Sequence, residues 1–172
     1  MYDWIELERV ENRGYQMKGF FRLFIGMFLI SILTGCIGED YDVGVPTAHL
    51  YSEDLATSVQ LAEGNVSWSS SSGDVDQKID DIQEFGLSQE KMKVTANEKI
   101  SLDFQENVRN GGDIWTDPKI TVALLKDEQR IELELHENRE FQIPNNKGGD
   151  VLEVVFTSSR GTAQYVGNIL IQ

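Results

Sequence analysis

Apolar and polar residues alternate along much of the chain after residue 46, with the period of two that is typical of β-strands. Strands are expected, in chain order, over residues 47–51, 55–61, 65–69, 91–96, 100–105, 120–124, 131–135, 141–143, 152–156 and 165–171. Alternating strands and helices of the kind that build a parallel sheet are missing from this pattern. Short strands at roughly ten-residue spacing indicate a mostly β fold, an antiparallel immunoglobulin-like β-sandwich.

One segment changes period. Val75, Ile79 and Ile82 follow one another at spacings of four and three, which predicts one short amphipathic helix over residues 74–85. Gly86 is expected to end this helix. Turns or loops are expected at residues 63–65, 69–73, 97–98, 105–118, 126–130, 144–149 and 158–161, where Gly, Asn, Asp, Ser and Pro gather.

The chain has one cysteine, so a disulfide within the domain is excluded and burial must stabilise the fold. A large side chain contributes about 1.5–3 kcal/mol when it is fully buried. The expected core residues are Trp68, Phe104, Leu124, Leu133, Phe141, Val155 and Tyr165.

A different apolar segment lies near the N-terminus. Residues 23–32 carry no charge and follow Lys18 and Arg22. This segment is too short to cross a bilayer core of about 30 Å as a helix, but it suits the apolar part of a signal peptide. The next residues, Leu33-Thr34-Gly35-Cys36, resemble a bacterial lipobox. The resemblance implies diacylglyceryl transfer to the sulfur of Cys36 and cleavage between Gly35 and Cys36.

We therefore expect a signal-peptide helix within residues 1–35, a polar lipid-anchored tether over 36–45 and a β-sandwich domain over 46–172. The alternative is an uncleaved signal anchor, or a stop-transfer helix, with an incidental cysteine. Residues 1–16 carry four acids, which is unusual ahead of a signal peptide. Either Met17 is the true initiator, which peptides from residues 1–16 in cell extracts would disprove, or the basic leader region is extended.

Residues 36–172 carry the whole net charge of −14, because they hold 25 Asp and Glu against 11 Lys and Arg. Such acidity disfavours nucleic acid and anionic headgroups as partners. It favours solubility, and it is compatible with a cation, a basic partner or a salty habitat.

The candidate chemistry is sparse. His49 and His136 are the two histidines, and neither accompanies a serine in a G-x-S-x-G setting. Asp74, Asp76, Asp80 and Asp81 could offer oxygen ligands to Ca²⁺, but they lack the glycine and the distal glutamate of an EF-hand loop. A solvated helix N-terminus explains the first two equally well.

Two further features have competing interpretations. No spacing among the acids favours the paired carboxylates of a glycosidase. Trp115 lies in a polar loop, where it is either an exposed anchor for a protein or glycan partner or a lid over the core. We expect no enzyme activity, no cofactor and no metal site, which leaves Cys36 as the one expected site residue, for lipidation.

A wider resemblance rests on short segments. Gly64-Asn65-Val66-Ser67-Trp68 and the stretches 97–104 and 141–144 occur in the order found in uncharacterised exported lipoproteins of Firmicutes. This chain lacks the cysteine expected in place of Ser67. The resemblance implies a β-sandwich and a location on the outer face of the cytoplasmic membrane. The expected function is a non-enzymatic interaction module with an envelope protein or glycan partner. The alternatives are a calcium- or small-ligand-binding lipoprotein and, more remotely, a cell-wall hydrolase.

Overall fold

The computed structural model describes residues 44–52, 58–70, 73–106, 114, 117–127 and 129–172, and the expected signal-peptide helix, Cys36 and Trp115 lie outside them. The elements of the described part are β1 (Thr47–Tyr51), β2 (Val59–Gln60), β3 (Ala62–Ser70), β4 (Gly73–Gln77), α2 (Ile82–Leu87), β5 (Lys91–Val94), β6 (Lys99–Gln105), β7 (Lys119–Lys126), β8 (Gln129–Leu133), β9 (Glu140–Gln142), β10 (Gly148–Ser158) and β11 (Gly161–Ile171). None of its helices is long and apolar enough to cross a membrane.

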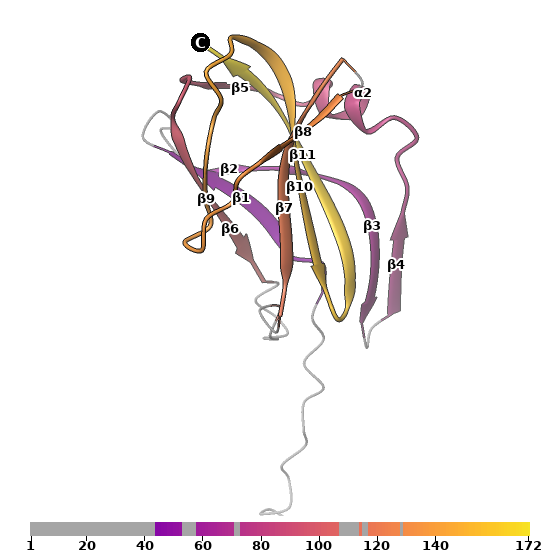
Figure 1. The fold of residues 1–172 in the computed structure, drawn as a ribbon. Helices are drawn as coiled ribbons and strands as arrows, with labels where there is room; N and C mark the ends of the chain where they lie inside the picture. The colour runs from indigo at the N-terminus through magenta and orange to yellow at the C-terminus, as the bar shows by residue number, and fades with distance from the viewer. Residues whose placement is uncertain (1–43, 53–57, 71–72, 107–113, 115–116, 128) are drawn as a thin grey trace, which may run out of the picture. The chain divides into compact units, whose positions relative to one another are not determined.

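Two β-sheets form the fold (Figure 1). The small sheet has the strand order β2-β1-β6-β9, and the large sheet has the order β4-β3-β11-β10-β7-β8. These pairs are antiparallel, so the predicted antiparallel sandwich is confirmed. One further pair, β5 with β11, is parallel and was not expected. β3 pairs with β11 only up to Val166, and β5 pairs with the remaining stretch from Asn168 to Ile171.

The core lies between the sheets and is built around aromatic rings. Phe156 has its ring centroid 4.7 Å from that of Phe104 and 6.2 Å from that of Trp68. Five expected core residues are confirmed as buried: Trp68, Phe104, Leu124, Phe141 and Tyr165. Leu133 is partly buried against this core.

The expectation that Val155 belongs to the core is wrong. Val154 and Phe156, on either side of it, are buried in the main cluster, whereas Val155 is half-buried on the opposite face of β10. Residues 152–156 include one polar residue, Glu153, but Val154 and Val155 are both apolar although they lie on opposite faces of β10. Hydrophobicity alone therefore does not distinguish the inward-facing Val154 from Val155.

The predicted helix over residues 74–85 is wrong over most of its length. Gly73–Gln77 forms β4, which pairs with β3 in a hairpin that places Val75 opposite Trp68. Gly73 has a φ of 135°, a value that glycine adopts readily, and it starts this returning strand. Asp74 and Asp76 therefore lie in a strand and not at a helix N-terminus.

The one described helix, α2, begins later. Its N-cap is Asp81, whose Oδ1 accepts a hydrogen bond of 2.8 Å from the Glu84 N–H. Gly86 lies inside the helix rather than after it, and a Cβ at this position would overlap the side chain of Val151. The helix packs on the outer face of the large sheet, where Ile82 and Phe85 contact a second small cluster formed by Leu125, Val151 and Val166.

Of the remaining turn and strand predictions, some are confirmed and others are wrong. The turns at 97–98 and 126–130 are confirmed, since Asn97 has a φ of 65° and β7 ends at Lys126 before β8 begins at Gln129. The turn predicted at 63–65 is wrong, because these residues lie within β3. A register shift in the β3–β11 pairing occurs there. The strand predicted over 55–61 is described only from residue 58, and β2 occupies two of its residues.

Tyr165 fixes the point at which the chain enters the sandwich. Its buried hydroxyl donates a hydrogen bond of 2.5 Å to the carbonyl oxygen of Pro46, immediately before β1. Burial, with a smaller contribution from the charge of Glu63, raises the pKa of Tyr165 far above its usual value of 10. The native state therefore holds this proton to a higher pH than the unfolded chain does.

This difference predicts a loss of stability in alkali. Above about pH 10 the unfolded chain releases the tyrosine proton and the native protein retains it. The free energy of unfolding should then fall by roughly 1.4 kcal/mol per pH unit through this group. Urea denaturation from about pH 9 to 11 would measure the slope, and Tyr165→Phe should remove that part of it. An equal slope in both proteins would contradict the assignment.

Candidate functional site

The outer face of the small sheet carries a row of polar side chains headed by an aromatic ring. Tyr51 on β1 lies opposite Ser101 on β6, and Ser101 lies opposite Glu140 on β9. Tyr51 is 38 % exposed, and its hydroxyl accepts a hydrogen bond of 3.3 Å from Gln105. An exposed tyrosine held by a neighbour offers a flat apolar surface with a polar rim, which suits molecular recognition.

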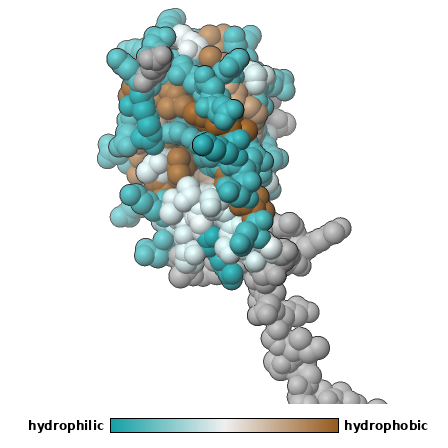
Figure 2. All heavy atoms as spheres, turned by 90° about the vertical axis from the view of Figure 1, so that its right-hand side faces the viewer, coloured by the Kyte–Doolittle hydropathy of each residue, from teal (hydrophilic) through white to brown (hydrophobic). Residues whose placement is uncertain are grey.

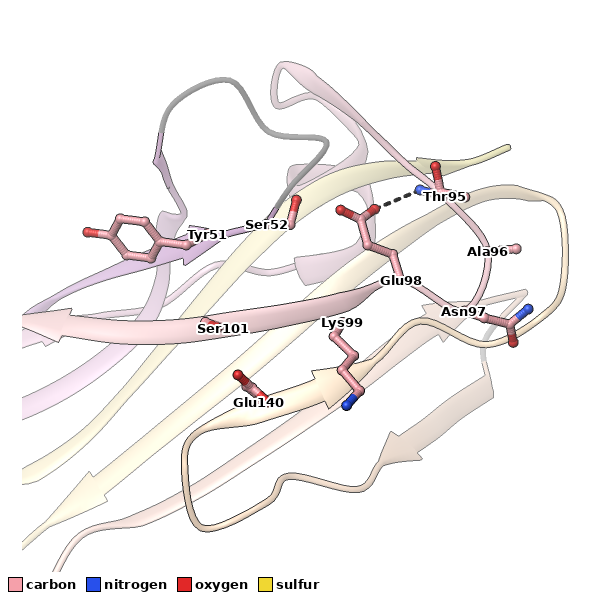
Figure 3. A pocket seen from close by; sticks show the side chains of 9 residues that line it. All are labelled: Tyr51, Ser52, Thr95, Ala96, Asn97, Glu98, Lys99, Ser101 and Glu140. Atoms are coloured by element: carbon pink, nitrogen blue, oxygen red, sulfur yellow. Dashed lines mark hydrogen bonds between the residues drawn. The ribbon is translucent and has the colours of Figure 1, made fainter.

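This row opens into a recess of about 710 Å³ at one end of the sheet (Figure 3). The end of β1 and strands β6 and β9 form part of the recess, and the turn between β5 and β6 completes it. Its lining residues are Tyr51, Ser52, Thr95, Ala96, Asn97, Glu98, Lys99, Ser101 and Glu140.

The turn that walls the recess is firmly tied to the rest of the fold. Glu98 accepts a hydrogen bond of 2.8 Å from the backbone N–H of Thr95, as Figure 3 shows. The backbone N–H groups of Asn97 and Ile143 donate to the carbonyl oxygens of Ile143 and Glu98 at 3.0 and 2.9 Å. Gln142 donates to the Asn97 carbonyl at 2.9 Å. The recess therefore has a preformed wall, which reduces the ordering cost of binding.

The lining offers several kinds of contact. Two carboxylates and one ammonium group supply charge, hydroxyl and amide groups supply hydrogen bonds, and the tyrosine ring supplies an apolar surface. Within the part of the chain that the structure describes, no three His, Cys, Asp or Glu side chains gather where they could hold a metal ion. A polar ligand with an apolar face, such as a peptide or a sugar, matches this lining best.

A polar ladder crosses the outer face of the large sheet. We define it as Arg130, Glu132, Glu153, Gln164 and Asn65. The buried carboxylate of Glu153 accepts hydrogen bonds from Arg130 Nε at 2.7 Å and from Gln164 Nε2 at 2.5 Å. Gln164 in turn accepts from Asn65 Nδ2 at 2.7 Å. Arg130 also pairs with Glu132 at 2.6 Å.

The polar ladder fixes the orientation of the Arg130 guanidinium group. The hydrogen bond to Glu153 is the largest cause of a raised pKa at Arg130, so this guanidinium is firmly charged. Two of its nitrogens are committed, Nε to Glu153 and Nη1 to Glu132. The contact of Nη2 with Thr121 is longer, at 3.4 Å. Arg130 thus presents an oriented, partly exposed charge on β8, the last strand of the large sheet.

Among the described residues, the two histidines lie apart and have other partners than a serine hydroxyl. His49 lies opposite Asp103 in the small sheet, but its Nε2 shares a hydrogen bond of 2.9 Å with the Thr47 hydroxyl. His136 is exposed in the connection between β8 and β9. Asp103 accepts a hydrogen bond of 3.2 Å from Arg139.

The four aspartates considered for calcium have other settings. Asp74 lies on β4, where it accepts a hydrogen bond of 2.6 Å from the Ser69 hydroxyl, and Asp76 lies two residues further along the same strand. Asp81 caps α2, and Asp80 is exposed just before it.

In comparisons with known proteins, no family model matches this chain, and no curated protein or solved structure shows a significant match. The site must therefore be read from its own residues. The sequence alone predicted a turn at residues 97–98 but indicated none of the residues that line the recess as a binding residue. The available signal was the alternation in residues 47–51, because burial of Ala48 and Leu50 turns Tyr51 outward.

Proposed function

We propose that this protein is a lipid-anchored, non-enzymatic interaction module on the outer face of the bacterial cytoplasmic membrane. Acylation of Cys36 holds it there, and the Tyr51 recess recognises an envelope protein or glycan. The lipobox resemblance at Leu33–Cys36 supports the anchor. Two acyl chains give stable membrane attachment, since each buried CH₂ contributes about 0.8 kcal/mol.

The observation that carries the proposal is the position of the recess relative to the start of the domain. The described chain enters the sandwich at Pro46, which Tyr165 holds, and β1 then runs from Thr47 to Tyr51. Tyr51 lies at the far end of β1 from Pro46, so the recess and the point where the described chain enters the sandwich are at opposite ends of this strand. We expect an anchor attached ahead of Pro46 to leave the recess accessible.

The charge of the chain limits the classes of partner that it can bind. A net charge of −14 opposes binding to nucleic acid and to anionic headgroups over a broad surface. The recess itself is mixed in charge and contains a tyrosine, so it favours a wall glycan or an exposed loop of a membrane protein. Sugar rings stack on aromatic faces, and peptide groups pair with the amide and hydroxyl groups of the lining.

The test compares Tyr51→Ala with Val75→Ala, since Val75 is also exposed and lies on the other sheet. Binding would be measured by co-sedimentation with purified cell-wall fragments and by photo-crosslinking in membranes. We expect Tyr51→Ala to weaken binding about tenfold or more, as for an aromatic anchor, and Val75→Ala to leave it unchanged. Equal binding by both variants, with native melting temperatures, would contradict a role for the recess.

A further inference from the structure

The large sheet ends in two edge strands, β8 on one side and β4 on the other. Each edge strand carries one exposed apolar residue between two charged residues. On β8 the sequence is Arg130-Ile131-Glu132 with Ile131 41 % exposed, and on β4 it is Asp74-Val75-Asp76 with Val75 44 % exposed. An edge strand offers backbone donors and acceptors to another strand, so each of these edges is a potential docking surface.

Charge distinguishes the two edges. Consider two copies that pair antiparallel about a two-fold axis through the apolar residue. On β8, Arg130 then lies opposite Glu132 of the second copy, and the symmetry creates this attractive pair twice. On β4, Asp74 lies opposite Asp76, and a repulsive pair is created twice. A mixed β8–β4 pair has one attractive and one repulsive contact. Of these two edges, β8 is the one that is complementary to itself.

The register is also correct for the faces of the sheet. A two-fold axis perpendicular to the sheet keeps residues of equal parity on the same face, so Ile131 meets Ile131 and the charged residues meet on the outer face. Arg130 and Glu132 share the outer face with Glu153, as their contacts show. Pairing would cover the exposed Ile131 side chains and join the two sheets into one.

The polar ladder holds the charged side chains of the β8 edge in place before a second copy binds. Glu153 fixes the Arg130 guanidinium from within the sheet, and Glu132 is exposed over 75 % of its side chain. Only Oε1 of Glu132 bonds to its own Arg130, so the carboxylate keeps an oxygen for a second cation. An arginine that is already ordered loses little side-chain entropy on pairing.

We propose that β8 is a homodimerisation edge, which pairs antiparallel with β8 of a second copy and is centred on Ile131. The β4 edge, on the side that Figure 2 faces, stays unpaired, since its acidic pattern repels a second β4.

Sedimentation equilibrium of the chain from residue 36 onward, with Cys36→Ser to prevent acylation and disulfides, tests the proposal. This chain contains the whole compact unit Asp40–Gln172. At an ionic strength of about 0.15 M, where the Debye length is about 8 Å, long-range repulsion between the acidic domains is largely screened. We expect a reversible monomer–dimer equilibrium.

Two substitutions should weaken dimerisation at least about tenfold: Ile131→Lys, which places two ammonium groups in contact, and Glu132→Arg, which turns both attractive pairs into arginine pairs. Glu132→Arg changes an exposed residue, so it tests the edge even if Ile131→Lys folds poorly. Val75→Lys is the matched control on β4 and should dimerise normally. A monomer at every concentration would overturn the proposal, and so would equal weakening by Val75→Lys and Glu132→Arg.

Discussion

Phe156→Ala should lower the free energy of unfolding by about 3–5 kcal/mol, the range for large aromatic residues truncated in a packed core. The Phe156 side chain is fully buried, and its ring lies against those of Phe104 and Trp68. Phe104 in turn has its ring centroid 5.8 Å from that of Tyr165. A cavity at Phe156 therefore weakens the packing of the two sheets against each other, and its effect is not confined to β10. Since domains are stabilised by about 5–15 kcal/mol, this change removes a large part of the total.

Urea denaturation followed by tryptophan fluorescence would measure this change, with the slope m checked against the unsubstituted protein. Val75→Ala is a suitable control, because its exposed position predicts a change within about 0.5 kcal/mol. A loss below about 1 kcal/mol for Phe156→Ala would show that the aromatic cluster does not support the sandwich.

Cys36→Ala should move the protein from the membrane fraction to the soluble fraction. In our proposal the acyl chains on Cys36 are the only stable attachment, because an uncleaved leader is too short in its apolar part to span the bilayer firmly. The remaining domain is strongly acidic and is repelled by anionic headgroups. Fractionation with immunoblotting would measure the shift.

Tyr165→Phe is the control for that experiment, since it alters the domain but leaves the lipobox intact. It should remain in the membrane fraction. Retention of Cys36→Ala in the membrane after a high-salt wash would contradict lipid anchoring and favour an uncleaved signal anchor.

Local alternation predicted the strands whose two faces differ in polarity. In β1, burial of Ala48 and Leu50 between polar neighbours gives a strand with the predicted bounds, Thr47–Tyr51. The same signal places Trp68 in the core. It fails at Val155, because the outer face of this central strand is also largely buried and carries apolar residues such as Val151 and Val155.

Non-local pairing explains the other errors. Val75 fits both a helical and an alternating pattern, and the hairpin with β3 decides between them. The parallel pairing of β5 depends on β3 leaving the end of β11 unpaired, which no short window of sequence can reveal. The recess, too, could not be found from any short window of sequence. Tyr51, Glu98 and Glu140 are far apart in the sequence and form no motif, so only the fold brings them to one site.

The most direct test of the account is the intact mass of the N-terminal peptide from protein extracted from bacterial membranes. We predict that this peptide begins at Cys36 and carries a diacylglyceryl group on the sulfur. Such a peptide would establish the anchor on which the proposed function depends. A peptide that extends through Gly35 into the leader, with an unmodified cysteine, would contradict the account.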